Sequence, residues 1–166
     1  MNLRHYTSEV LTFDPSRTYE QNAPRTFGKP VGFWVSVEGE DDWPSWCQSA
    51  EFAVESLSHI AAVSLADGHR ILELAWPEDL TRFAAKYLVR VRSNDWGIDW
   101  QRVASDYDGL IIAPYQWSCR LGMDWYYGWD CASGCIWNLA AIDSVWAKHY
   151  ANVDAESALF AIDGGA

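Results

Sequence analysis

The sequence predicts a single α+β domain, on three observations. The chain has 166 residues, enough for one domain with a proper core. Hydrophobic residues make up 49% of it and charged residues 21%, an ordinary globular composition. Strand-like segments stand near both ends with helical patterns between them, which favours α+β over a regular βαβ alternation. We expect the domain to span residues 1–150 and an acidic, small-residue-rich tail to span residues 151–166.

The first elements are two strands separated by a long loop. Residues 2–7 predict the first strand, and residues 31–37 predict a second, buried one. The polar stretch over residues 13–30 predicts a loop that could serve as a lid over a site. Its breakers are Asp14-Pro15, Ala23-Pro24 and Gly28-Lys29-Pro30.

Three helices are expected in the middle of the chain. The clearest is capped by Asp41 or Asp42 and has Pro44 in its first turn. Its apolar residues recur at helical spacing: Trp43, Trp46, Cys47, Ala50, Val54 and Leu57. A second helix opens at Pro77, and a short third one lies around Trp100.

The remaining strands are short and apolar. Residues 60–65 and 69–75 predict two strands joined by the turn signal Asp67-Gly68, which allows a hairpin without establishing their pairing. Residues 110–113 predict a fully apolar strand, and residues 135–137 a last core strand. Residues 114–128 are aromatic without a clear period, so we expect them to be irregular.

Charge and hydropathy exclude several classes of partner. The formal charge of −11 disfavours non-specific binding to nucleic acid or to an anionic membrane surface. Arg4, Arg25 and Lys29 remain available for a local basic pocket. No apolar run has membrane-spanning length and the N-terminus lacks a signal peptide's apolar stretch, so a cytoplasmic protein is expected.

The cysteines do not predict a metal site. Cys47, Cys119, Cys131 and Cys135 lack paired C-x-x-C spacing, and no His stands beside the last two to complete a zinc set. Buried thiols are expected instead. A small hydrolase that uses Cys119, Cys131 or Cys135 with His5 is a weaker hypothesis, since none of them stands in a recognisable nucleophile setting.

Three segments carry polar groups that a core alone does not explain. Arg4, His5, Tyr6 and Thr7 are four consecutive hydrogen-bonding side chains in one strand, and buried polar groups need partners, which a ligand can supply.

In the second segment, Gly32 lets the backbone pass close to another group, and Ser36 shares a strand face with Trp34. The competing interpretation is that Ser36 is merely a strand-end hydroxyl. In the third segment, Asp130 stands among aromatic residues just before an apolar strand, which favours either a functional-site carboxylate or the cap of the bend after it.

These segments resemble motifs of the ADP-ribosyltransferase superfamily. Leu3-Arg4-His5-Tyr6-Thr7 is similar to its His-containing first strand, and Gly32-Phe33-Trp34-Val35-Ser36 to its second motif. Tyr107-Asp108-Gly109-Leu110-Ile111-Ile112 and then Gly134-Cys135-Ile136-Trp137-Asn138 resemble its two closing strands. The resemblance covers roughly residues 2–145 through short, degenerate motifs.

The resemblance implies a split β-sheet domain that binds NAD, as a substrate, between two half-sheets. His5 would hold a ribose of NAD, on the adenosine or the nicotinamide side, and Arg4 matches a branch of the family that uses arginine there. Thr7 would lie beside the nicotinamide amide.

It also implies stacking positions for the nicotinamide. Trp34 would pack near the ring with support from Ser36, and Trp43 or Trp46 would provide a second stacking position on the following helix.

The chain departs from the family at the expected acid. Transferases of the family usually carry a glutamate at the start of the closing strand, and this chain has Ser133 there. Asp130 is the nearest acid and Asp124 a weaker candidate, so we expect Asp130 and His5 to be catalytic. Without an acid there, the domain would be a divergent transferase, a phosphotransferase-like relative or a non-catalytic NAD-site remnant.

Two functional hypotheses follow. The first is an NAD-dependent ADP-ribosyltransferase-like enzyme with a macromolecular acceptor, a protein rather than a nucleic acid. The second is a non-enzymatic, acidic binding module that docks a partner protein through its tryptophans, because the chain has 11 of them and aromatic side chains dominate interface hot spots.

Overall fold

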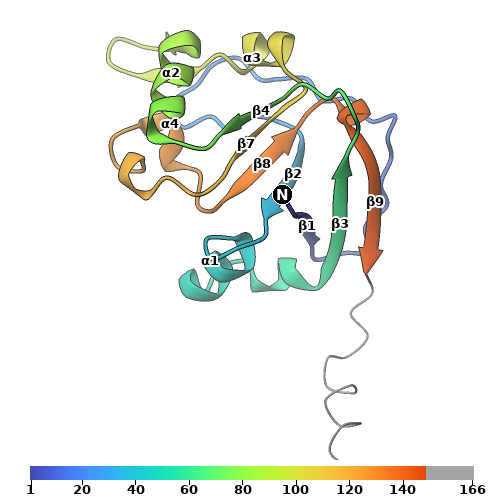
Figure 1. Ribbon diagram of the computed structural model, residues 1–166. Helices are drawn as coiled ribbons and strands as arrows, with labels where there is room; N and C mark the ends of the chain where they lie inside the picture. The colour runs from blue at the N-terminus through green and yellow to red at the C-terminus, as the bar shows by residue number, and fades with distance from the viewer. Residues whose placement is uncertain (149–166) are drawn as a thin grey trace, which may run out of the picture.

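A seven-stranded mixed sheet forms the centre of the computed structural model, which describes residues 1–148 (Figure 1). The strands are β1 (Leu3–Thr7), β2 (Phe33–Val37), β3 (His59–Leu65), β4 (Ile71–Leu74), β5 (Leu88–Arg90), β6 (Trp96–Ile98), β7 (Gly109–Ile112), β8 (Ser133–Ile136) and β9 (Ile142–Lys148). The helices are α1 (Trp43–Ala50), α2 (Pro77–Tyr87), α3 (Trp100–Asp106) and α4 (Asp124–Tyr127), with the 3-10 turns η1 (Val54–Leu57), η2 (Trp117–Cys119) and η3 (Leu139–Ala141). The predicted α+β class is confirmed, and the tail predicted over residues 151–166 lies outside the described residues.

The strand order of the sheet is β4-β7-β8-β2-β1-β3-β9. Within residues 1–148 only the β4–β7 pair is parallel, and β5 and β6 form a separate two-stranded ribbon. Figure 1 shows β3 and β9 on one side and β4, β7 and β8 on the other, with β1 and β2 between the two groups. The centre of the sheet is therefore where the first two strands of the chain meet.

Two hydrophobic clusters cover the faces of the sheet. The larger packs α2, α3 and α4 against one face and includes Leu80, Trp100, Leu110, Trp125 and Trp129. The smaller includes Leu3, Phe33, Val35, Ile111 and Ile136 on the other face, with Leu11, Phe13 and Tyr19 of the long loop against it. Because side chains alternate along a strand, β2 contributes Phe33 and Val35 to the second cluster and turns Trp34 and Ser36 to the first side.

The first helix is shorter than its apolar spacing predicts. Of the two predicted caps, Asp41 and Asp42, the structure has Asp42, which accepts a hydrogen bond from the Ser45 N–H at 2.9 Å. The helix ends at Ala50 because Glu51 adopts a left-handed backbone with φ of 50°. Val54 to Leu57 then form the separate turn η1 rather than another helical turn.

The strands at 59–65 and 71–74 do not form a hairpin. β3 pairs with β1 and β9, whereas β4 crosses to the far edge and pairs with β7. The predicted close approach at Gly32 is confirmed, because a Cβ there would lie 2.6 Å from the Ile136 carbonyl oxygen of the neighbouring strand. Strands β5, β6 and β9 were not predicted, and residues 114–128, predicted to be irregular, contain η2 and α4.

Among residues 1–148, every helix is too short or too polar to span a lipid bilayer.

Candidate functional site

The sheet opens between β1 and β2. These strands share only two paired positions, Leu3 with Val37 and Arg4 with Ser36, whereas β1 pairs with β3 at five positions and β2 with β8 at four. Beyond Arg4 the backbone ladder between them stops. We call this point the fork.

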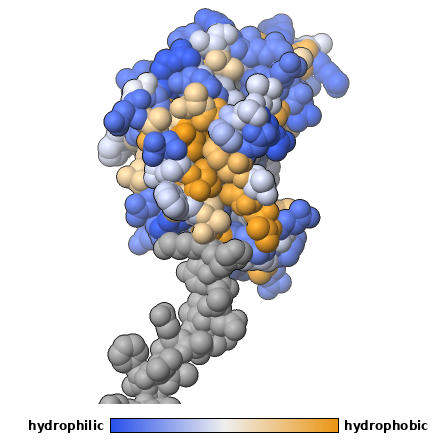
Figure 2. Space-filling model, turned by 90° about the vertical axis from the view of Figure 1, so that its right-hand side faces the viewer, coloured by the Kyte–Doolittle hydropathy of each residue, from blue (hydrophilic) through white to orange (hydrophobic). Residues whose placement is uncertain are grey.

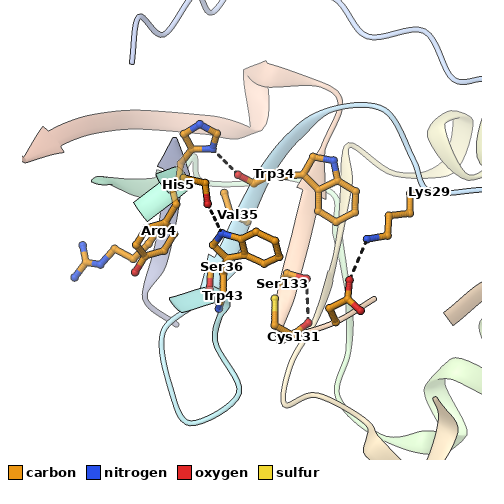
Figure 3. Close-up of a pocket in the computed structure, with 12 residues that line it drawn as sticks. Arg4, His5, Lys29, Trp34, Val35, Ser36, Trp43, Cys131 and Ser133 are labelled. Carbon is orange, nitrogen blue, oxygen red and sulfur yellow. Dashed lines mark hydrogen bonds and ion pairs between the residues drawn. The ribbon is translucent and has the colours of Figure 1, made fainter. Parts of the chain in front are cut away.

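A pocket of about 250 Å³ lies at the fork (Figure 3). Its walls come from β1, β2, α1, η1, the end of the long loop and the segment before β8. The lining residues are Arg4, His5, Tyr6, Lys29, Trp34, Val35, Ser36, Trp43, Ser56, Asp130, Cys131 and Ser133. The three segments singled out in the sequence therefore meet around one cavity.

His5 bridges the fork with its side chain. Its Nδ1 lies 2.7 Å from the Trp34 carbonyl oxygen, and its ring stacks on Phe33 with centroids 4.2 Å apart. Because a carbonyl oxygen can only accept, Nδ1 carries the proton and Nε2 of the neutral ring is left as an acceptor. Burial lowers the pKa of His5 below its usual 6.5, although the Trp34 carbonyl opposes that shift. The imidazole is thus held neutral in a fixed tautomer.

Trp34 supplies an aromatic wall of the pocket. Its ring is tilted against buried Trp129 with centroids 5.1 Å apart, which holds it in place. The Lys29 ammonium lies 5.4 Å from the centroid of the Trp34 ring, within cation–π range.

Ser36 and Trp43 connect the pocket to α1. The buried Ser36 Oγ accepts a hydrogen bond from the Trp43 N–H at 2.9 Å, and so satisfies one of the free donors at the helix start. Trp43 in turn donates from Nε1 to Ser56 Oγ at 3.1 Å. Ser36 is therefore more than a strand-end hydroxyl, because it fixes the helix that carries Trp43.

Asp130 is held by two cations at the pocket wall. Arg120 Nη2 donates to Asp130 Oδ1 at 3.1 Å, and Lys29 Nζ lies 3.7 Å from Asp130 Oδ2. Arg120 Nη1 also donates to the Tyr115 hydroxyl at 3.1 Å, and that hydroxyl donates to the Trp129 carbonyl. Asp130 does not cap the following bend, where the Ala132 N–H donates to the Asp41 carbonyl instead.

Two of the predicted NAD-binding residues lie away from the pocket. Thr7 stands at the end of β1, where its Oγ1 accepts from the Glu9 N–H at 3.2 Å. Trp46 lies behind Trp43, with stacked rings 5.1 Å apart. The others, Arg4, His5, Trp34, Ser36, Trp43 and Asp130, line it, and Arg4 is paired with Glu38 at 3.2 Å.

The long loop does not cover this pocket as a whole. Only Lys29, at its end, lines the pocket, and Arg25 does not. The segment from Leu11 to Tyr19, which includes the first part of the loop, lines a second hollow of about 270 Å³ that also borders His5 and Trp34.

The cysteines offer no activated thiol beside His5. Burial raises the pKa of Cys131 to about 12 and that of Cys135 well above the usual value, so both are protonated at neutral pH. The His5 imidazole bonds to a backbone carbonyl rather than to a thiol. These facts argue against the hydrolase hypothesis.

Within residues 1–148, no group of three or more His, Cys, Asp or Glu side chains is arranged to hold a metal ion.

Some site residues had little or no signal in the sequence. Ser56 reaches the pocket only because α1 stops at Ala50, and no local pattern predicts that stop. Arg120 lies in a segment without a clear period, and its pairing with Asp130 depends on tertiary structure.

Comparisons of the chain with protein-family models, with curated proteins and with solved structures return no match. Function is therefore inferred from the chemistry of the site.

Proposed function

We propose that the protein is an NAD-dependent ADP-ribosyltransferase-like enzyme. It would cleave the bond between nicotinamide and ribose and transfer ADP-ribose to an acceptor. The observation that carries the proposal is the fork, where a pocket opens between β1 and β2 and is lined by residues of all three motif segments. A sheet that parts at its centre also supports the split-sheet architecture that the resemblance implies.

The pocket suits one end of a dinucleotide. Sites for drug-sized ligands measure about 300–1,000 Å³, and this one measures about 250 Å³. A flat ring with its ribose fits such a space, and the remainder of NAD would extend out of it. Trp34 and Trp43 supply aromatic faces for the ring.

His5 is suited to hold a ribose hydroxyl. Its neutral ring leaves Nε2 as an acceptor, and the bond from Nδ1 to the Trp34 carbonyl fixes the ring on the Phe33 side of the fork, where it also borders the second hollow. An imidazole held in this way can accept a hydrogen bond from a hydroxyl of the part of NAD that extends out of the pocket.

Asp130 would stabilise the charge that develops during the reaction. As the C1′–N bond breaks, its electron pair moves to the nicotinamide nitrogen and the ribose becomes positively charged. A carboxylate at the pocket wall stabilises that charge electrostatically. The acceptor then bonds to C1′ and releases a proton.

The acceptor is proposed to be a protein. The chain's formal charge of −11 repels the phosphates of a nucleic acid and attracts basic protein surfaces.

Intrinsic tryptophan fluorescence titrated with NAD tests the binding step. Stacking of nicotinamide on Trp34 should quench the signal, and Trp34→Leu should remove most of that quenching. Trp146→Leu is the matched control, because Trp146 is 68% exposed on β9 and does not line the pocket. An unchanged signal at millimolar NAD in the wild-type protein would contradict the proposal.

Transfer is tested with labelled NAD and a host lysate. The wild-type chain should label a macromolecule that is destroyed by protease and not by nuclease. Labelling that survives Asp130→Ala but is lost in His5→Ala would assign the acid to another residue.

A second candidate function is a non-enzymatic module that docks a partner protein. Figure 2 shows a band of hydrophobic side chains on the side of the molecule that carries β9, and the edge strand β9 has Trp146 68% exposed. Under this hypothesis, Trp146→Ser would weaken partner binding while Trp34→Leu would not. The enzyme hypothesis predicts the reverse pattern for NAD.

A further inference from the structure

Lys29 places a positive charge between an aromatic face and a carboxylate. Its ammonium lies 5.4 Å from the centroid of the Trp34 ring and 3.7 Å from Asp130 Oδ2 (Figure 3). The face of an indole ring carries partial negative charge, and the carboxylate adds a full one. The space between these two groups is therefore already occupied by a cation.

We propose that Trp34 and Asp130 form a subsite selective for a flat cationic ring, and that Lys29 occupies this subsite until such a ring displaces it. The chemical class of the ligand is a pyridinium, and identifying it with the oxidised nicotinamide of NAD rests on the proposed function. Trp34 and Asp130 would then determine the specificity, because a neutral ring gains less from an aromatic face beside a carboxylate, and Lys29 would set the free-energy cost of entering the subsite.

The contact of Lys29 with Asp130 is loose enough to be exchanged. The 3.7 Å separation exceeds hydrogen-bond length, and the Lys29 side chain is 41% exposed. Exposed pairs of this kind contribute little free energy, so displacing the ammonium should change a dissociation constant by about fivefold at most.

Asp130 stays in position when Lys29 leaves. Arg120 holds the other carboxylate oxygen with a hydrogen bond of 3.1 Å and is itself bonded to the Tyr115 hydroxyl. The carboxylate therefore keeps its place and can meet the incoming ring.

The opposite role for Lys29 is a ligand for the pyrophosphate of NAD. The two roles predict changes of opposite sign. A pyrophosphate ligand strengthens binding, so its removal weakens it, whereas removing an occupant of the cation subsite strengthens the binding of a cation. The positive charges of Arg4 and Lys29 at the pocket are paired with the carboxylates of Glu38 and Asp130. This pairing favours Lys29 as the occupant of the cation subsite over Lys29 as a pyrophosphate ligand.

The test compares a cationic and a neutral ring of nearly the same shape. The dissociation constants of 1-methylnicotinamide and nicotinamide are measured by tryptophan fluorescence on the wild-type chain and on Lys29→Met. The wild-type protein should bind the cation more tightly than the neutral ring. Lys29→Met should bind the cation about two- to fivefold more tightly and should strengthen nicotinamide binding by a smaller factor.

Lys86→Met is the matched control. It removes the same charge from the chain at a residue that does not line the pocket, and should alter neither constant. Equal affinity of the wild-type protein for both rings, or weaker cation binding by Lys29→Met, would overturn the proposal.

Failure of this inference is distinguishable from failure of the proposed function. Cation selectivity that increases in Lys29→Met, without transfer from labelled NAD, would keep the subsite and reject the enzyme. Transfer from NAD together with weaker cation binding by Lys29→Met would keep the enzyme and reject the role of Lys29.

Discussion

Asp108 and Asp130 are both held by an arginine, yet their surroundings differ. Asp108 is 7% exposed and accepts hydrogen bonds from the Arg70 N–H, the Arg70 guanidinium and the Asn138 side chain at 2.8–2.9 Å. Its backbone bonds to Arg70 and Asn138 as well, so it joins the start of β4 to the segment after β8. Its carboxylate oxygens accept three hydrogen bonds from the protein, and its side chain is only 10% exposed.

Asp130 has a different environment. Its side chain is 22% exposed and lines a pocket, with one firm partner, Arg120, and one loose partner, Lys29. An Asp–Arg pair alone therefore does not mark a functional site. A carboxylate with an exchangeable partner beside a cavity is available to a ligand, whereas one saturated by backbone and side-chain donors serves the fold.

The largest expected effect is on activity, from Asp130→Asn. This change removes the charge but keeps the shape, and it should lower the rate of labelled ADP-ribose transfer about 10²–10³-fold. The free energy of urea unfolding should change by less than about 1 kcal/mol, since both partners of Asp130 remain partly exposed. Asp124→Asn is the control, because Asp124 is an exposed carboxylate on the nearby α4. If Asp124→Asn is the inactive variant, the acid has been assigned wrongly.

The second effect is on stability, from Asp108→Asn. The variant keeps one side-chain oxygen that can accept from the Arg70 or Asn138 donors. An amide group replaces the other oxygen and cannot accept from the donor that faces it, so the free energy of unfolding should fall by about 2–3 kcal/mol. The folded fraction should bind NAD with wild-type affinity, as fluorescence titration below the unfolding transition would show. Wild-type stability together with weakened NAD binding would reverse the roles of the two acids.

A smaller effect is expected from Tyr115→Phe. The Tyr115 hydroxyl accepts from Arg120, which holds Asp130, so its loss should loosen the carboxylate without removing it. One hydrogen bond of this kind is worth about 1 kcal/mol, which corresponds to a fall in kcat of roughly fivefold. KM for NAD should stay the same, because Tyr115 does not line the pocket. A change in KM with constant kcat would assign Tyr115 to binding rather than to positioning.

The parts of the site that could be predicted are those with local signals. A polar first strand, the glycine before β2 and the cap of α1 each act within a few residues, and they brought His5, Trp34 and Trp43 to one pocket. The directions of Thr7 and Trp46 could not be predicted, because β1 ends at Thr7 and the stacked pair on α1 exposes only its inner member to the pocket.

The topology of the sheet was less predictable for a physical reason. The pairing of β4 with β7 joins segments nearly 40 residues apart, and a turn signal at Asp67-Gly68 says nothing about which strand lies beside which. The ladder between β1 and β2 stops after Arg4, while β1 continues to pair with β3 and β2 continues to pair with β8. The break therefore involves four strands, and no single segment of the sequence encodes it.

The smallest expected effect is the pH dependence that His5 adds to stability. Because burial lowers its pKa below 6.5, the unfolded chain binds a proton more readily than the folded one, and stability falls as pH drops from about 6.5 toward the folded pKa. Protonation leaves the Nδ1 bond to the Trp34 carbonyl intact, which limits the loss of stability.

Asp108 titrates in a separate pH range. Burial tends to raise its pKa, but the hydrogen bonds from Arg70 and Asn138 outweigh this effect and lower the pKa below 3.8, so its contribution to stability persists until much more acidic pH. Urea unfolding between about pH 8 and pH 5 therefore isolates the histidine. His5→Asn should flatten the dependence of the unfolding free energy on pH relative to the wild-type protein. Asp108→Asn should lower the unfolding free energy at every pH in this range and keep the wild-type slope. An unchanged slope in His5→Asn would mean that the imidazole at the fork is not held neutral.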